Sequence, residues 1–195
     1  MIQKLSAITA RWLEKEGAVS EGNRSLYGYA VYSLLFGLMP ILIAAVLGMI
    51  FGMLREGLLM ILPFMLIRKF SGGYHLSSPG RCVLFSSILI ALALSTVKAV
   101  LRWGNLSVLT VLVFASTVSL WLFSPVDNEA RRLSEKEKLV FRRVTRGMAV
   151  GFLTAYLAAS AAAFPGLAVP MGVGVVIPAL LQLPALFPVS GSKDS

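Results

Sequence analysis

Residues 26–50, LYGYAVYSLLFGLMPILIAAVLGMI, run from Leu26 to Ile50 without one charged side chain. About 20 consecutive apolar residues are needed for a helix to cross the hydrocarbon core of a bilayer. This run is long enough to do so. Its glycines and Pro40 predict bends or close helix packing rather than an end to the helix.

Five further apolar runs follow, at residues 52–67, 83–100, 106–123, 147–164 and 167–189. The second run of the chain is short and opens with Arg55 and Glu56, which we expect at the outer membrane interface. The last run contains four prolines. Because proline removes a backbone donor and disturbs the preceding turn, this run is expected to be kinked or partly re-entrant.

The composition agrees with a membrane location. The 195 residues are 57% hydrophobic and 14% charged, whereas soluble domains have about 25% charged residues. We therefore predict an all-α fold, a polytopic membrane bundle of about six transmembrane segments within residues 26–189. No internal repeat or linker divides residues 1–195, so one domain is expected.

The charge distribution predicts an orientation. The net charge is +9, from 18 Lys and Arg against 9 Asp and Glu. With a cytoplasmic N-terminus, all basic residues except Arg55, Lys98 and Arg102 fall on the cytoplasmic side, as the positive-inside rule requires. Both termini and the basic loops then face the cytoplasm and anionic lipid. No soluble basic face is visible, so nucleic acid is not expected as a partner.

Residues 1–17 precede the first run and contain an amphipathic pattern. Apolar residues of the segment IQKLSAITARWLEK recur roughly along one helical stripe, with charged residues mostly elsewhere. This pattern predicts an interfacial helix on the membrane surface, although an ordinary helix packed on protein has the same pattern. No apolar segment typical of a cleavable signal appears before Leu26.

A polar gap at residues 68–82, RKFSGGYHLSSPGRC, holds the single histidine and the single cysteine. Ser78 and Pro79 are typical of a helix N-cap and first helical residue. Cys82 would then lie in the first turn, where the helix dipole favours a thiolate, with His75 as general base. Seven residues span about 10.5 Å along one helix, so the chain must fold back to join the two side chains.

Neighbouring residues of the same gap are suited to stabilising charge. Gly72 and Gly73 would free backbone N–H groups for a developing oxyanion. Arg68 would serve the same charge or bind a substrate carboxylate. Two metal ligands are too few and a lone cysteine makes no disulfide, so no metal and no cofactor are predicted. A structural cysteine beside a solvated histidine is an equally good interpretation of these residues alone.

The stretch from Arg68 to Ser86, RKFSGGYHLSSPGRCVLFS, resembles the signature of the accessory gene regulator protein B (AgrB) family. These are bacterial membrane cysteine endopeptidases that process quorum-sensing propeptides. The family pattern has a basic pair, then Gly-Gly-Tyr-His, then a cysteine seven residues after the histidine, and each feature is present. SPVDNEARRLSEKEK, from Ser124 onward, resembles the family's later cytoplasmic loop. The resemblance covers essentially the whole chain.

The resemblance implies roles for matching positions. Cys82 would be the nucleophile and His75 its base, at the cytoplasmic face of the bacterial cell membrane. Asp127 or Asn128, on the other cytoplasmic loop, would be a candidate to orient His75. A homodimer is also implied. Two further positions that the family needs are filled by Arg68 and Gly73.

The implied substrate is an AgrD-like propeptide with an amphipathic helix, a central cysteine and an acidic C-terminal tail. Cys82 would release the tail through an acyl-enzyme thioester, and the substrate thiol would displace Cys82 to give a cyclic thiolactone. Lys69, Arg131 and Arg132 are candidate contacts for the tail. The basic stretch 131–146 is equally suited to anionic lipid.

Other classes of function fit the sequence less well. A non-catalytic peptide transporter or exporter would need polar residues inside the spans. The spans contain mostly Ser, Thr and Gly as their less apolar residues, and Lys98 lies only near the end of one. An enzyme of lipid head groups usually needs clustered acidic metal ligands. No H-E-x-x-H pair indicates a metalloprotease. Ser77 and Ser78 lack the G-x-S-x-G frame of a serine hydrolase.

Overall fold

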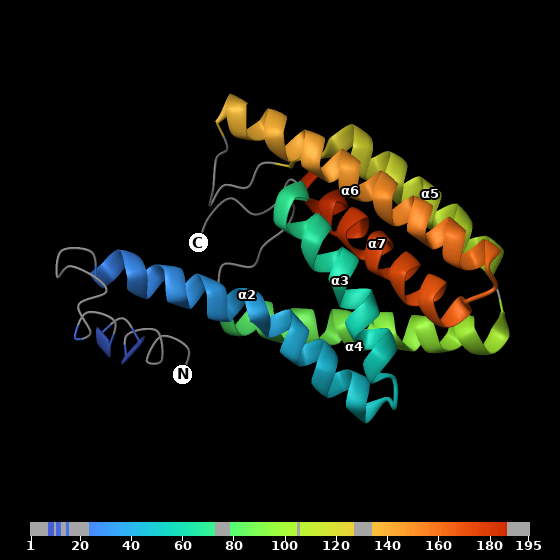
Figure 1. The fold of residues 1–195 in the computed structure, drawn as a ribbon, viewed down its shortest axis with the longest axis horizontal. Helices are drawn as coiled ribbons and strands as arrows, with labels where there is room; N and C mark the ends of the chain where they lie inside the picture. The colour runs from blue at the N-terminus through green and yellow to red at the C-terminus, as the bar shows by residue number, and fades with distance from the viewer. Residues whose placement is uncertain are drawn as a thin grey trace. The chain divides into compact units, whose positions relative to one another are not determined.

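The computed structural model describes residues 8, 9, 11, 12, 15, 24–72, 79–104, 106–126 and 134–186. Apart from one isolated backbone bridge, the regular secondary structure of these residues is α-helical. The predicted all-α fold is therefore confirmed. The long helices (Figure 1) are α2 (Arg24–Ile50), α3 (Leu54–Ser71), α4 (Pro79–Trp103), α5 (Leu106–Phe123), α6 (Glu135–Ala161) and α7 (Pro165–Leu186).

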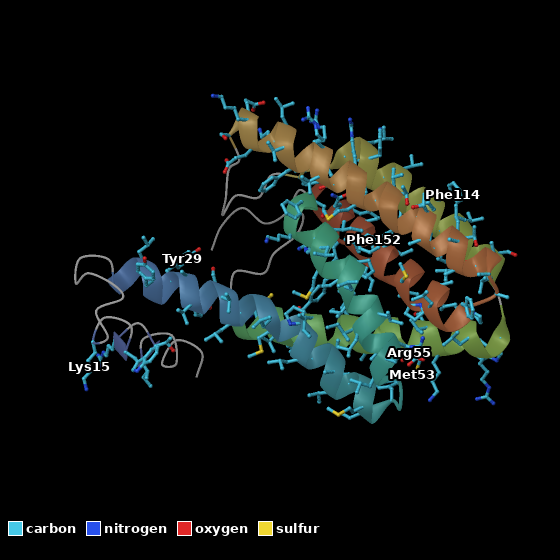
Figure 2. The ribbon with its side chains drawn as sticks, viewed as in Figure 1. Lys15, Tyr29, Met53, Arg55, Phe114 and Phe152 are labelled. Atoms are coloured by element: carbon cyan, nitrogen blue, oxygen red, sulfur yellow. The ribbon has the colours of Figure 1, made fainter. Side chains whose placement is uncertain are left out.

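Four of these helices are long and apolar enough to cross a membrane, over Leu26–Ile50, Gly80–Trp103, Leu106–Phe123 and Pro165–Leu183. Helix α3 carries charged residues at both ends. Figure 2 shows Met53 just before α3 and Arg55 in the first turn of α3, at the end remote from Ser71. The predicted membrane bundle of helices is confirmed.

The chain divides into two units, residues 1–42 and 43–195. In the first unit, Tyr32 and Phe36 stack on α2 with ring centroids 5.8 Å apart. In the second unit, α7 is the central helix and packs against α3, α4, α5 and α6. Figure 1 shows α5, α6 and α7 running alongside one another. Two thirds of the apolar window of α7 is buried (67%), against 11% for α2.

Small residues bring α7 close to its neighbours. A Cβ atom on Gly174 would collide with the carbonyl oxygen of Met60 in α3, and one on Gly172 would lie 2.9 Å from the Tyr156 ring in α6. Tyr156 is fully buried, and its hydroxyl hydrogen-bonds Thr110 Oγ1 of α5 at 2.8 Å. Glycines at such crossings let helix backbones approach closely, which favours packing inside a membrane.

Helix α7 is one continuous helix from Pro165 to Leu186. This differs from the partly re-entrant segment that its prolines predicted, whereas a kink within the continuous helix stays a prediction. Each internal proline removes one backbone hydrogen bond. Helix α7 nevertheless stays helical through its internal prolines and packs against four other helices.

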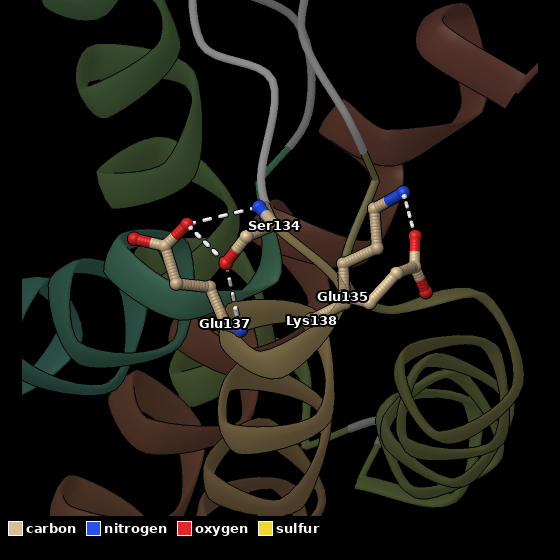
Figure 3. Close-up of polar contacts among 4 residues, drawn as sticks. All are labelled: Ser134, Glu135, Glu137 and Lys138. Carbon is tan, nitrogen blue, oxygen red and sulfur yellow. Dashed lines mark hydrogen bonds and ion pairs between the residues drawn. The ribbon is translucent and has the colours of Figure 1, made fainter.

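Helix α6 begins earlier than its apolar run, at Glu135 instead of Gly147. A capping box defines this start (Figure 3): the Ser134 hydroxyl accepts the Glu137 N–H at 3.3 Å, and the Glu137 carboxylate accepts the Ser134 N–H at 2.9 Å. Reciprocal caps of this kind satisfy the free donors of a first turn. Half of the stretch predicted as a polar loop is therefore helical.

Candidate active site

The C-terminal ends of α3 and α5 meet at one end of the bundle. Val126, just past α5, donates its N–H to the Ser71 carbonyl, the last of α3, at 2.9 Å. This bond belongs to a parallel backbone bridge between Gly72 and Val126. The two polar stretches that the charge pattern assigns to one membrane side, residues 68–82 and 124–146, thus touch each other.

The start of α6 lies at the same end. Phe141 packs edge-on against Phe70 of α3, with ring centroids 5.4 Å apart. Arg146 donates from Nε to the Trp121 carbonyl in the last turn of α5 at 3.0 Å, and its guanidinium lies 4.8 Å from the centre of the Trp121 ring. A cation at a helix C-terminus complements the dipole, so Arg146 fixes α6 against the end of α5.

Gly72 is the residue that lets the two stretches touch. Its φ is +71°, a left-handed conformation that favours glycine. A Cβ atom there would also overlap the Val126 carbonyl group. Glycine is therefore required at this position by both the backbone conformation and the contact.

Arg68 lies in the last turn of α3, beyond the apolar run that ends at Ile67, and is partly buried. It donates from Nη1 to the Gly72 carbonyl at 2.6 Å. Burial lowers the pKa of Arg68 to about 10, and the charge of a thiolate at nearby Cys82 raises this pKa in part. The guanidinium therefore remains a cation at neutral pH and interacts electrostatically with Cys82.

Cys82 lies in the first turn of α4, which begins at Pro79 as predicted. Its side chain is half-buried and is a free thiol. The structure therefore places the cysteine sulfur in the first turn of α4, where it interacts electrostatically with Arg68.

The remaining candidate residues are distributed as follows. Lys69 is exposed, and its Nζ lies 5.5 Å from the centre of the Phe70 ring. In the part of the chain that the structure describes, no three His, Cys, Asp or Glu side chains gather to hold a metal. Outside the described residues are His75, Gly73, Arg131 and Arg132, and also the proposed orienting residues Asp127 and Asn128.

Sequence reasoning did not identify Gln182, which links this end of the bundle from α7. It is fully buried and donates from Nε2 to the Ser71 carbonyl at 3.1 Å and to Ser124 Oγ at 2.8 Å. A signal was present: α7 is otherwise apolar, and a polar side chain within such a helix usually has a buried partner.

The comparisons with known proteins concern nearly the whole chain. The family model of Accessory gene regulator B matches residues 6–177. AgrB-like protein 2 of Clostridium perfringens (strain 13 / Type A) is 24% identical over 163 residues, which are 80% of this chain and 74% of that protein. An AgrB-like protein of C. perfringens (strain SM101 / Type A) is similar to the same degree, 24% over 163 residues with the same coverage. No solved structure matches the chain.

Proposed function

Because the chain belongs to the accessory gene regulator B family, we propose that it is a membrane cysteine endopeptidase that processes a quorum-sensing propeptide. The observation that carries the proposal is the family match over residues 6–177, which include the single cysteine, Cys82, in the first turn of α4. The electrostatic interaction of Cys82 with the partly buried cation of Arg68 agrees with it. A cation held at a helix start is an environment that activates a thiol. His75, seven residues before Cys82, is the proposed general base.

The first step releases the tail of the propeptide. The Cys82 sulfur attacks the backbone carbonyl that precedes the tail, and its proton passes to His75. The C–N bond breaks, the tail nitrogen takes the proton from His75, and the acyl group remains on Cys82 as a thioester. Arg68, and backbone N–H groups of Gly72 and Gly73, support the negative charge of the tetrahedral intermediate.

The second step closes the ring. The thiol of the peptide's own cysteine gives its proton to His75 and attacks the same carbonyl, Cys82 leaves as a thiolate, and a cyclic thiolactone forms. This step consumes no water. Water would compete with the substrate thiol for the thioester, so the site must exclude water for the cyclic product to form in preference to the hydrolysed acid. A substrate thiol held beside the thioester has a high effective concentration, which favours the cyclic product.

The substrate approaches from the basic side of the bundle. Exposed Lys136, Arg142 and Arg143 on the first half of α6 add positive charge to that of Arg131 and Arg132. This charge would attract the acidic tail of an AgrD-like propeptide, or anionic lipid on which its amphipathic helix lies. Added salt should weaken either attraction.

The site and both termini are proposed to face the cytoplasm. Support comes from the positions of the basic residues along the chain. Arg68, Arg146 and the capped start of α6 lie at the end of the second unit where Gly72 meets Val126, and the positive-inside rule assigns such an end to the cytoplasm. A homodimer in the bacterial cell membrane completes the proposal.

A vesicle assay tests the proposed activity. The chain, in vesicles containing anionic lipid, is given a synthetic peptide with an amphipathic helix, an internal cysteine and an acidic tail. Mass spectrometry is expected to detect the free tail and a core peptide lighter by one water than the hydrolysed acid. A peptide whose cysteine is replaced by alanine should give only the linear acid. Uncut peptide found inside the vesicles would contradict the proposal and indicate transport.

Replacing the cation near the sulfur tests its activation. Arg68→Gln is expected to slow alkylation of Cys82 by iodoacetamide at pH 7 about three- to tenfold, because the thiolate that reacts loses its neighbouring positive charge. Arg81→Gln is the matched control: Arg81 adjoins Cys82 but is exposed, so solvent screens its charge and the rate should change less. Equal rates in the two variants would refute the pairing.

A further inference from the structure

Gln182 of α7 joins the two polar stretches through its carboxamide, as a buried side chain with no part in the chemistry proposed above. We infer that Gln182 is a positioning residue for the peptidase site: its two donated hydrogen bonds fix where the chain leaves α3 toward His75 and Cys82. The inference rests on the proposed function and adds to it a residue from α7, far in sequence from His75 and Cys82.

The geometry assigns the orientation of the carboxamide. The Ser71 carbonyl only accepts hydrogen bonds, so the nitrogen of Gln182 must face it, at 3.1 Å. The second N–H goes to Ser124 Oγ, at 2.8 Å. Both partners are as buried as Gln182 itself, with exposed fractions of 0% for Ser71 and 1% for Ser124. The oxygen of the carboxamide is buried and has no partner among the described residues.

A set of hydrogen bonds leads from Gln182 to Arg68, which interacts electrostatically with Cys82. The Ser71 carbonyl accepts from both Gln182 and Val126, which fills its two lone pairs. The next carbonyl, that of Gly72, accepts a hydrogen bond from Arg68, and the Arg68 cation interacts electrostatically with Cys82. Gln182 therefore holds the peptide unit beside the one that orients Arg68.

The Ser71 carbonyl can be held only by a hydrogen-bond donor, so a positioning role for Gln182 requires its N–H groups and not only its volume. Gln182→Glu keeps the shape of the side chain but donates only while its carboxyl is protonated. Processing should then be retained at low pH and should fall at least tenfold as pH rises, because the ionised carboxylate repels the Ser71 carbonyl. Each rate is taken relative to that of the wild-type chain at the same pH.

The direction of this step does not depend on the surrounding charges, although its midpoint does. Burial raises the pKa of a carboxyl and nearby cations lower it. Helices α5 and α7 carry no ionisable side chain. The polar parts of the other helices against α7 carry Arg68, Lys69, Arg81, Cys82, Glu135, Lys136, Glu137, Lys138, Arg142, Arg143 and Arg146.

A second variant gives a readout that is independent of catalysis. Gln182→Met keeps the volume and removes both donors, and it should reduce processing about tenfold or more and speed hydrogen exchange of the Val126 amide. Leu183→Met is the matched control, since Leu183 is the next residue along and is exposed; it should behave like the wild-type chain in both measurements.

These outcomes separate the inference from the proposed function. If Gln182→Glu follows the wild-type pH profile and Gln182→Met leaves Val126 exchange unchanged, Gln182 is not a positioning residue. If the introduced carboxyl prevents insertion, the exchange of Val126 in Gln182→Met decides alone. The proposed function itself would be contradicted by a different result, namely processing by a variant that lacks the Cys82 sulfur.

Discussion

Cys82→Ala is expected to abolish release of the propeptide tail while the chain still inserts into the membrane. Cys82 is the single cysteine of the chain, so no other thiol can form the thioester. Removing the nucleophile of a hydrolase lowers its rate by about 10⁴-fold or more. Stability should change little, because the half-buried side chain loses one sulfur atom and no hydrogen bond that the structure describes.

The measurement is mass spectrometry of the peptide after incubation with variant and wild-type vesicles, at matched amounts of inserted protein. Ser86→Ala provides the control, since it removes one polar atom a turn further along α4, and it should process at the wild-type rate. Cys82→Ser keeps the shape with a far weaker nucleophile and should be as inactive as Cys82→Ala. Tail release by Cys82→Ala at even a tenth of the wild-type rate would disprove the assignment of Cys82.

Gly72→Ala is expected to open the junction between the two polar stretches and to lower processing more than tenfold. An alanine would meet the Val126 carbonyl at the position of its Cβ, and it would hold a φ of +71°. The left-handed conformation alone costs about 1–2 kcal/mol for a residue with a Cβ. The collision with backbone adds to this cost, so the pairing with Val126 should break before the helices unfold.

The matched control for this variant is Gly80→Ala. A Cβ on Gly80 meets no atom within 4 Å, and Gly80 lies inside α4, where alanine is favoured over glycine by about 1 kcal/mol. It should therefore be at least as stable as the wild-type chain and fully active. The readouts are processing and hydrogen exchange of the Val126 amide. Wild-type exchange in Gly72→Ala would show that the junction does not depend on glycine.

Helix ends that coincide with the ends of an apolar run could be predicted from the sequence. Helix ends that lie within a polar stretch were predicted less well. The run at residues 106–123 coincides with α5, because the charged or turn-forming residues beside it end both the run and the helix. The start of α6 was placed twelve residues late, at Gly147 instead of Glu135, since hydropathy cannot detect a helix that begins in water. Ser134 and Glu137 held the missed signal, a capping box.

The candidate site was predictable where local sequence determines it. Ser-Pro before Cys82 predicted the start of α4, and the structure confirms it at Pro79. The pairing of Gly72 with Val126 and the bond from Gln182 to Ser71 join residues far apart in sequence, and no periodicity encodes such contacts. The fold-back that would bring His75 to Cys82 stays a prediction, since His75 lies outside the described residues.

The junction at the end of α3 is built mainly from main-chain atoms: the carbonyls of Ser71 and Gly72 and the N–H of Val126. Main-chain groups are the same in every residue type, so mutations in the adjoining loops can alter their side chains without dismantling the scaffold. Such an architecture is evolvable. A lineage of these proteins can acquire new peptide preferences by drift in loop sequence, provided that the glycine and the buried carboxamide persist.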